Sequence, residues 1–212
     1  MSTSRRRTGP KPSFNERDVI DAALTIGINQ FTMKQVAQAL GIGTSSLYRV
    51  VSSQEALVEK CLSHLATQFL VEEEGLSWDD YLFQAVDVLW GLLESYPGLD
   101  YTFINVTSVP QIFQPCFSKL SGDLLAGGFV GERERIEFVI DFLFEIVVTT
   151  HYQLGPVRRD FEMLKEKAAG SEENLFFVTD ESWLERGWLD RKVRFIIAGL
   201  KNDLDLEAGI KE

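Results

Sequence analysis

Polar side chains that suit contact with nucleic acid lie between residues 31 and 57, at the ends of two short apolar patterns. Lys34 stands near the start of the first pattern, and Ser45, Tyr48 and Arg49 follow a glycine-bearing turn. Hydroxyl groups and cations bind phosphate oxygens, and an arginine can donate two hydrogen bonds to the edge of a guanine. The types and spacing of these side chains therefore predict recognition of phosphates and base edges.

Arrangements typical of catalysis or metal binding do not occur in the sequence. There is no nucleophile elbow and no histidine-rich cluster, and the only histidines, His64 and His151, lie in separate helical patterns. Each could hydrogen-bond a small molecule or serve as a satisfied structural residue. Cys61 and Cys116 are far apart in apolar contexts and are expected to be reduced, inert thiols. We expect no enzymatic activity, no cofactor and no metal.

The charge of the chain is divided unequally along its length. Residues 1–60 carry eight Lys/Arg and five Asp/Glu, a formal charge of +3, which leaves −14 for the remainder of a chain whose total is −11. A basic first segment joined to an acidic remainder is the asymmetry expected when only the first domain meets phosphates. With 45 % hydrophobic residues among 212, the chain is long and apolar enough for a sizeable core.

Polar caps and glycines mark the helices that would position these side chains. The first helix is expected to start at Ser13, with Glu16 in capping-box position, and to end at Gly27. The second is expected to start at Thr32 and to end at Gly41. The third is expected to start at Thr44 or Ser45, and the fourth at Ser52 or Ser53. Apolar residues recur at helical spacing within each segment. The fourth helix continues through Leu57, Cys61 and Leu65, so it leaves the first domain and enters the next.

The rest of the chain is also helical in pattern, without a strand pattern or an internal repeat. Long helices are expected from Trp78 to a break at residues 96–98, from Pro110 to about Ala126, from Glu132 to about His151 with a stop at Gly155 and Pro156, and from Ser182 to about Leu204, with a short charged helix before the last. The predicted fold class is all-α, with a three-helix helix-turn-helix head joined by a long fourth helix to a helical-bundle dimerisation and ligand-binding domain. The predicted division is a flexible basic arm at 1–12, a DNA-binding domain at 13–60 and a dimerisation and effector domain at 61–212.

The head resembles the DNA-binding domain of TetR-type transcriptional regulators. The matching residues are Thr32, Val36, Ala37, Leu40, Gly41, Ser46, Leu47, Tyr48, Glu55 and Leu57. Family members usually have an aromatic residue at the position of Val51, often a histidine at Val50, and commonly a phosphate-binding lysine at Gln54. The sequence departs from the family at these three positions, and the absence of the lysine predicts weaker DNA affinity with a flatter salt dependence.

The DNA-binding residues expected from the chemistry and the resemblance lie in the head and the arm. They are Thr32, Lys34, Thr44, Ser45, Ser46, Tyr48 and Arg49, with Arg5, Arg6 and Arg7. Arg49 either pairs with a guanine or contacts a phosphate or another side chain. The arm, which also contains Lys11, either inserts into a narrow minor groove or is an ordinary solubilising tail.

The resemblance implies that the second domain dimerises through its last two long helices and often holds a small-molecule pocket. Expected dimer residues are Phe144, Val148, Trp188, Val193, Ile196 and Leu200. Expected pocket residues are His64, Trp78, Tyr81, Trp90, Tyr101, Phe103, Phe113, Phe117, Phe138, Asp141, Phe142 and Glu145. These aromatic residues form either a ligand site or ordinary core. Glu137, Asp141 and Glu145 form one acidic line, which faces either solvent at the edge of the dimer or a cavity that accepts a cationic or hydroxylated ligand.

The leading functional hypothesis is a dimeric transcriptional repressor that binds an inverted-repeat operator and is released by a small apolar or cationic effector. The alternative is a DNA-binding interaction protein of the same fold, with a packed body and no small-molecule effector. The expected partners are double-stranded operator DNA, a small molecule and a second copy of the chain. No run of about 18 apolar residues is present, so we expect a cytoplasmic protein with no membrane partner.

Overall fold

The computed structural model describes residues 14–169 and 180–202, and in this part of the chain all regular structure is helical. The first four helices are α1 (Glu16–Ile26), α2 (Met33–Ala39), α3 (Thr44–Leu47) and α4 (Gln54–Ala66). The next six are α5 (Trp78–Ser95), α6 (Leu99–Asn105), α7 (Val109–Ala126), α8 (Arg133–Arg159), α9 (Phe161–Ala169) and α10 (Leu189–Lys201), with a 3₁₀ turn, η1 (Glu181–Leu184), before α10. The all-α prediction is confirmed.

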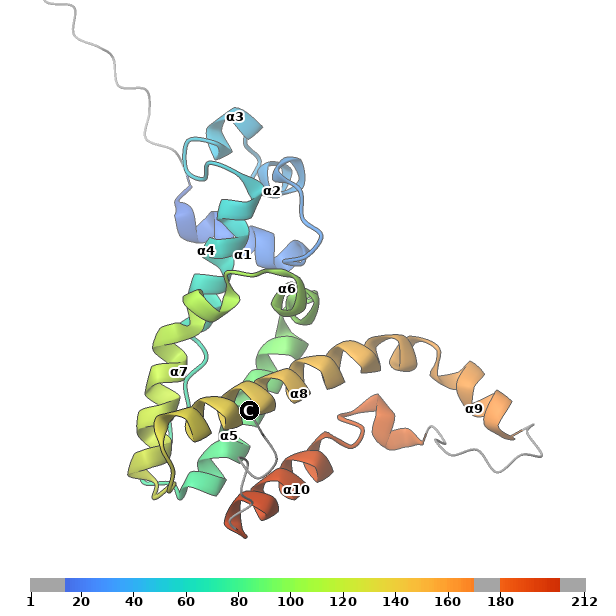
Figure 1. Cartoon of the computed structure of the whole chain (residues 1–212). Coiled ribbons are helices and arrows are strands. Elements are labelled where there is room, and N and C mark those ends of the chain that lie inside the picture. Colours follow the sequence, from blue (N-terminus) through green and yellow to red (C-terminus); the bar gives the residue numbers. More distant parts are fainter. Residues whose placement is uncertain (1–13, 170–179, 203–212) are drawn as a thin grey trace, which may run out of the picture.

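The molecule has a small head at one end and a larger body at the other (Figure 1). Helices α1, α2 and α3 form the head, and α4 runs from the head into the body, where it contacts α7. In the body, α5, α7 and α8 pack against one another, while α10 packs along α8. The buried residues of α4 from Leu57 to Ala66 belong to one apolar cluster with buried residues of the head and of the body. The core is therefore continuous from head to body. The predicted domain boundary at residue 60 falls inside this helix and stays a prediction.

The head helices begin where short polar side chains can cap them. Asn15 caps α1 in a capping box with Asp18, and Thr32 caps α2 in a capping box with Gln35. The predicted start at Thr32 is confirmed. Ser13, predicted to cap α1, lies outside the described residues, and its predicted role is wrong because Asn15 occupies the cap position.

Two predicted boundaries in the body are wrong. Helix α8 does not stop near His151 but continues through Gly155 and Pro156 to Arg159. Proline removes one intrahelical hydrogen bond, a local cost of about 3 kcal/mol, yet Leu154 is buried at this point and its packing favours the continued helix. The predicted helix from Ser182 to Leu204 is divided into η1 and α10, because Gly187 adopts φ = 55° between them.

The short helix α6 was not predicted from the sequence. It begins after Gly98, whose φ of 81° suits glycine, and it covers one side of α8. The described helices include none that is long and apolar enough to span a lipid bilayer.

Candidate nucleic-acid interface and body cavity

The helix-turn-helix is built from α2, a tight turn and the single-turn helix α3. Gly41 has φ = 67°, and the amide of Ile42 donates to the carbonyl of Ala37 at 2.9 Å, which reverses the chain direction. Leu47 of α3 and Val51 after it are buried in the head core. With its apolar side anchored in this way, α3 presents the opposite side to solvent at the far end of the molecule (Figure 1).

Most of the predicted DNA-binding residues of the head lie on this exposed surface. The side chains of Thr32, Lys34, Thr44, Ser45, Tyr48 and Arg49 are exposed, and Ser46 is half-buried. Tyr48 is 52 % exposed, which is unusual for an aromatic side chain with no role outside the core. Within the part of the chain that the structure describes, Lys34, Tyr48 and Arg49 make no side-chain hydrogen bond or ion pair, so their donors are available to an external acceptor.

Thr32 has a more restricted role than predicted. Its hydroxyl donates to the side-chain oxygen of Gln35 at 2.8 Å and accepts from the backbone amide of Gln35 at 3.2 Å. The capping box therefore uses the hydroxyl proton that was expected to reach a phosphate. The amides of Met33 and Lys34, in the first turn of α2, remain able to bind an anion.

Gln54 makes a contact that the sequence did not predict. Its side-chain amide nitrogen donates to the carbonyl oxygen of Phe31 at 3.0 Å, which ties the start of α4 to the residue that precedes the N-cap of α2. A lysine at this position would leave that carbonyl without this donor. Val50 and Val51, the other two departures from the family pattern, pack in or against the head core.

Arg5, Arg6, Arg7 and Lys11 lie outside the described residues, so their predicted contacts with DNA stay predictions.

Head and body meet through a chain of polar contacts from α1 to α5. The Arg17 guanidinium donates to Nδ1 of His64 at 3.1 Å, and the other ring nitrogen lies 2.8 Å from the side-chain nitrogen of Gln68. The Tyr96 hydroxyl donates to the side-chain oxygen of Gln68 at 3.0 Å. A backbone hydrogen bond of 3.2 Å from the Ile28 amide to the Pro97 carbonyl joins the same two parts of the molecule.

His64 was predicted to line an effector pocket, and the structure places it in this junction between head and body. Burial of the ring, and then the nearby Arg17 guanidinium, lower the pKa of His64 from its ordinary value, while Asp21 opposes them. The neutral ring can accept the hydrogen bond from Arg17, and a protonated ring cannot.

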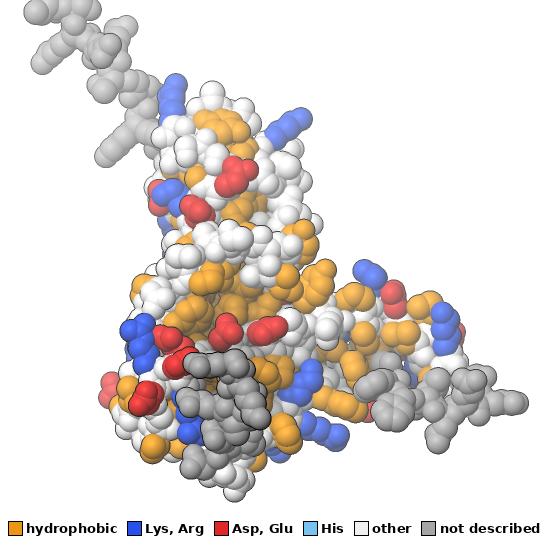
Figure 2. All heavy atoms as spheres, in the orientation of Figure 1, with side chains coloured by type: hydrophobic (Ala, Val, Ile, Leu, Met, Phe, Trp, Pro, Cys, Tyr) orange, Lys and Arg blue, Asp and Glu red, His pale blue; other side chains and the backbone are white. Residues whose placement is uncertain are grey.

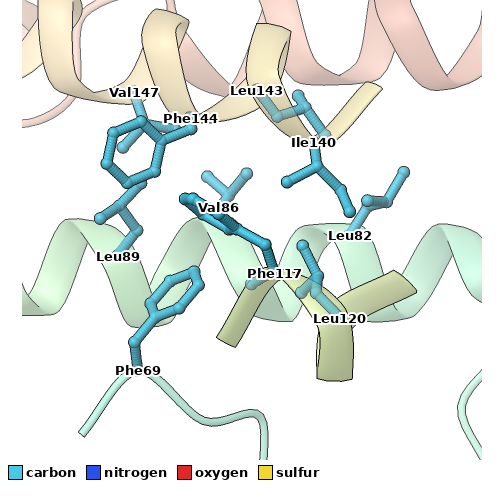
Figure 3. Close-up of a pocket in the computed structure, with 11 residues that line it drawn as sticks. Phe69, Leu82, Val86, Leu89, Phe117, Leu120, Ile140, Leu143, Phe144 and Val147 are labelled. Atoms are coloured by element: carbon cyan, nitrogen blue, oxygen red, sulfur yellow. The ribbon is translucent and has the colours of Figure 1, made fainter. Parts of the chain in front are cut away.

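The body contains one small cavity that is lined entirely by apolar side chains (Figure 3). The lining residues come from the segment after α4 and from α5, α7 and α8. They are Phe69, Leu82, Ala85, Val86, Leu89, Phe117, Leu120, Ile140, Leu143, Phe144 and Val147. The cavity has a volume of about 20 Å³. A volume of that size holds about one water molecule, so a larger ligand needs the side chains to move.

Three of the predicted pocket aromatics lie at or beside this cavity. Phe117 lines it, while Phe113 packs between Phe69 and Phe103 with ring centroids 6.3 and 5.3 Å away. Phe144, predicted at the dimer interface, lines the cavity and contacts Phe117 at 5.7 Å. Phe69 and the aliphatic lining residues were missed, because apolar residues at helical spacing predict core and cavity walls equally.

The acidic line does not face the cavity. Glu137, Asp141 and Glu145 are all exposed on α8, and Glu137 pairs with Arg133 at 2.5 Å. The predictions that Asp141 and Glu145 line an effector pocket are therefore wrong, because a carboxylate on this side of α8 stays hydrated. Within the protomer the acidic line faces solvent, and its place at the edge of a dimer stays a prediction.

Five other predicted aromatics are not among the lining residues of this cavity. Phe138, Phe142 and Tyr101 are exposed, with the first two rings stacked 5.9 Å apart. Trp78 packs edge-on against Phe129 at 5.3 Å, and Trp90 contacts His151 at 5.1 Å. The exposed rings of Phe138, Phe142 and Tyr101 do not line this cavity, while the assignment of Trp78 and Trp90 to an effector pocket stays a prediction.

Tyr81 does not line this cavity but lines a smaller neighbouring one, which shares Phe69 and Leu120 with it. The Tyr81 hydroxyl donates to Asp123, and burial with this carboxylate raises the pKa of Tyr81. His151 has a comparable structural role, because its Nδ1 lies 2.7 Å from a carboxylate oxygen of Asp100. Both polar groups are thus paired inside the protein.

The predicted dimer residues fall into two groups. Val148 and Val193 are buried within the protomer, on α8 and α10, so they are not exposed to a second copy. Trp188 is 41 % exposed, and Ile196 and Leu200 are half-buried. These three stay predictions.

The thiols and acidic groups give no sign of metal chemistry. Cys61 is buried, and burial raises its pKa to about 12, so the thiol stays protonated and inert. Across residues 14–169 and 180–202, no group of three His, Cys, Asp or Glu is placed to hold a metal ion.

Comparison with known proteins gives matches of structure and none of sequence. Neither a protein-family model nor a curated protein matches the chain. ActR from Streptomyces coelicolor, a TetR-family protein solved with actinorhodin, has a TM-score of 0.71 at 19 % identity over 94 % of this chain and all of its own. A TetR variant from Acinetobacter baumannii solved with minocycline has a TM-score of 0.67 at 18 % identity, covering 94 % and 97 %.

A third solved structure extends the comparison to a regulator without a named ligand. The Streptomyces coelicolor regulator SCO7222 has a TM-score of 0.66 at 15 % identity, covering 89 % of this chain and 98 % of its own. These likenesses span head and body alike, whereas the residues that carry the sequence resemblance lie in the head. The chain therefore has the fold of TetR-family transcriptional regulators.

Proposed function

We propose that this protein is a dimeric transcriptional repressor that binds an inverted-repeat operator and is released from it by an apolar small molecule. The observation that carries the DNA-binding part is the exposed surface of α3. Ser45, Tyr48 and Arg49 lie on a short helix whose other side is packed into the head, and their side chains are exposed at the end of the molecule. That is the geometry with which a recognition helix enters a major groove.

The body cavity supports the effector part of the proposal. Its lining is entirely apolar, and proteins of this fold have been solved with actinorhodin and with minocycline. Because the acidic line lies on the surface, the lining favours an apolar effector over a cationic one. Entry of a ligand must separate α5, α7 and α8, and Phe69, three residues after the end of α4, would move with them.

Helix α4 offers a physical route from the cavity to α3. Its buried residues pack against α1 in the head, so a displacement at Phe69 changes the orientation of the head on the body. In a dimer, this change alters the distance between two recognition helices that must match half-sites about 34 Å apart. An effector that binds the displaced state more tightly therefore lowers operator affinity.

DNA recognition is tested by selecting bound sequences from a random pool and titrating the selected duplex with wild type and Arg49→Ala. If Arg49 reads a guanine, the variant loses about 1–3 kcal/mol on the selected sequence and much less on an unrelated duplex. Lys167→Ala, an exposed cation of α9, is the matched control and should bind like wild type. Failure of the wild type to enrich any sequence would refute the proposal.

Effector binding is tested by thermal unfolding with a library of lipophilic compounds, followed by operator release. A compound that binds only the folded state raises the melting temperature. Ala85→Leu, which fills part of the cavity, should abolish that shift, whereas Ala168→Leu on α9 should retain it. If no compound shifts the wild type, the alternative of a packed body with no effector is supported.

A further inference from the structure

The body cavity has one wall that is not helical. Every lining residue other than Phe69 belongs to α5, α7 or α8, which also pack directly against one another. Phe69 belongs to the α4–α5 loop, defined here as residues 69–76, and its ring points from this loop toward the cavity in Figure 3. The loop is therefore the wall that can move without disrupting a helix.

Few polar contacts hold the α4–α5 loop in place. Within the described residues, the backbone amides and carbonyls of residues 70–76 make no hydrogen bond. The loop is joined to α5 by a hydrogen bond of 3.0 Å from the side-chain nitrogen of Gln84 to the carboxylate of Glu73. Burial of Phe69 and Val71 supplies most of its remaining attachment. A segment held in this way opens at a low cost in free energy.

A second cavity and a surface groove lie in series with the body cavity along this loop. Phe69 and Leu120 line both the body cavity and the second one, which has a volume of about 10 Å³. Tyr81 and Lys119 line both the second cavity and the groove, which has a volume of about 820 Å³ and can hold a small molecule. The three spaces thus form a row from solvent to the body cavity, separated by side chains that they share.

Tyr81 and Lys119 close the outer end of this row by binding one carboxylate. The Tyr81 hydroxyl, from α5, and the Lys119 ammonium, from α7, both donate to the same oxygen of Asp123, the ammonium at 2.6 Å. The Tyr81 side chain is buried, whereas Lys119 and Asp123 are partly exposed. A Tyr81 side chain that turns away from Asp123 opens the groove to the second cavity.

The rim of the groove is acidic. Glu72, Glu73 and Glu74 line it and are exposed, while Lys119 is the basic residue among its lining. Figure 2 shows that acidic side chains also gather over the first half of α8, so the body is acidic beyond this rim. Such a field lowers the local concentration of anions and slows their association.

We propose that the effector enters the body cavity from this groove, beneath the α4–α5 loop, and that the acidic rim excludes anionic molecules. This inference rests on the effector cavity of the proposed function, and it assigns the entry route and the charge of the effector. Tyr81 and Asp123 are positioning residues that hold the route closed. Because the loop directly follows α4, a molecule that displaces the loop also moves the end of the helix that carries the head.

The role of the rim is tested with two fluorescent probes that share one ring skeleton. N-phenylnaphthylamine is uncharged, and anilinonaphthalene sulfonate carries one negative charge. Stopped-flow fluorescence of the full chain measures their association rate constants. Glu72→Gln/Glu74→Gln should raise the constant for the sulfonate about threefold or more and leave that for the uncharged probe unchanged. Glu162→Gln/Glu166→Gln, which neutralises two exposed carboxylates of α9, is the matched control and should change neither.

The closing contact is tested with Tyr81→Phe, which removes the hydroxyl that donates to Asp123. Association and dissociation of the uncharged probe should both accelerate by about two- to tenfold, the net contribution of one hydrogen bond. The dissociation constant should change little, because the contact closes the route in the free and in the occupied protein alike. Tyr152→Phe, which alters an exposed ring of α8, should behave like wild type, and thermal unfolding reports whether each variant is folded.

Ala85→Leu, which fills part of the body cavity, shows whether the probes reach it, because the fluorescence change should then disappear. If Ala85→Leu prevents binding but Tyr81→Phe leaves both rates unchanged, the entry route is wrong. An unchanged sulfonate rate in Glu72→Gln/Glu74→Gln would overturn the selection against anions. A wild type that binds neither probe would instead refute the effector cavity, and the route with it, so the failures are distinguishable.

Discussion

At the scale of single residues, Gln54 shows that a departure from a family pattern can replace one function by another. Where the family commonly has a phosphate-binding lysine, Gln54 donates to the Phe31 carbonyl at 3.0 Å. We expect Gln54→Lys to lower the free energy of unfolding by about 0.5–1.5 kcal/mol, the net contribution of one hydrogen bond. The new cation should steepen the salt dependence of operator binding by about 0.9 in the log–log slope.

Urea unfolding and fluorescence anisotropy at several salt concentrations measure the two effects separately. Gln54→Met, which removes the hydrogen bond without adding charge, is the control. It should reproduce the loss of stability and leave the slope unchanged, and equal slopes for the lysine and methionine variants would show that residue 54 does not reach a phosphate.

The lowered pKa of His64 predicts how the free energy of unfolding depends on pH. Since burial and then Arg17 lower its pKa from 6.5, the unfolded chain binds more protons than the folded protein just below that pH. The contribution of His64 to stability is therefore present above its unfolded pKa of 6.5 and is lost as the pH falls through that value toward the lower folded one. The free energy of unfolding, measured with urea, should fall between about pH 7.5 and about pH 5.5. The fall should be smaller for His64→Gln than for wild type. Carboxylates titrate in both proteins, so equal losses would contradict this role for His64.

At the scale of helices, the contact between the α1–α2 turn and the α5–α6 turn depends on a glycine. Gly98 has φ = 81°, and a methyl group built on it would overlap the side chain of Asn29 from the head. We expect Gly98→Ala to cost about 1–3 kcal/mol, from a left-handed backbone conformation and this overlap.

Adding Asn29→Ala removes the overlap and leaves the backbone cost. The double variant should therefore regain part of the lost stability in urea unfolding, whereas Asn29→Ala alone should change it little. If the double variant were no more stable than Gly98→Ala, the side chain of Asn29 would not approach Gly98 in solution.

The helices could be predicted more fully than the site, for physical reasons. Capping is local, so Thr32 and the break at residues 96–98 located helix ends correctly. Pro156 did not end α8, because the packing of Leu154 is a tertiary contact that no local rule contains. Asp141 and Phe142 were misplaced because a helical pattern gives the spacing of residues along a face and not the neighbour that the face meets.

At the scale of the whole molecule, an acidic body is attached to a small basic head. Beyond residue 60 the formal charge is −14, so favourable interaction with phosphates depends on the head and on the arm that precedes α1. Deletion of residues 1–11 should weaken operator binding and reduce its salt slope by up to about 3.6 if all four arm cations contact phosphates. Titration of an operator duplex at two salt concentrations measures both, and an unchanged slope would identify the arm as an ordinary tail.

The hydrogen bond from the Ile28 amide to the Pro97 carbonyl allows opening of the junction between head and body to be followed by hydrogen exchange. Because the donor belongs to the head and the acceptor to the body, the Ile28 proton exchanges with deuterated solvent when the two parts separate. Its exchange rate therefore measures how often the junction opens, without a probe or a mutation. An effector that displaces the head should accelerate exchange at this one amide, while amides buried in the middle of α5 keep their protection.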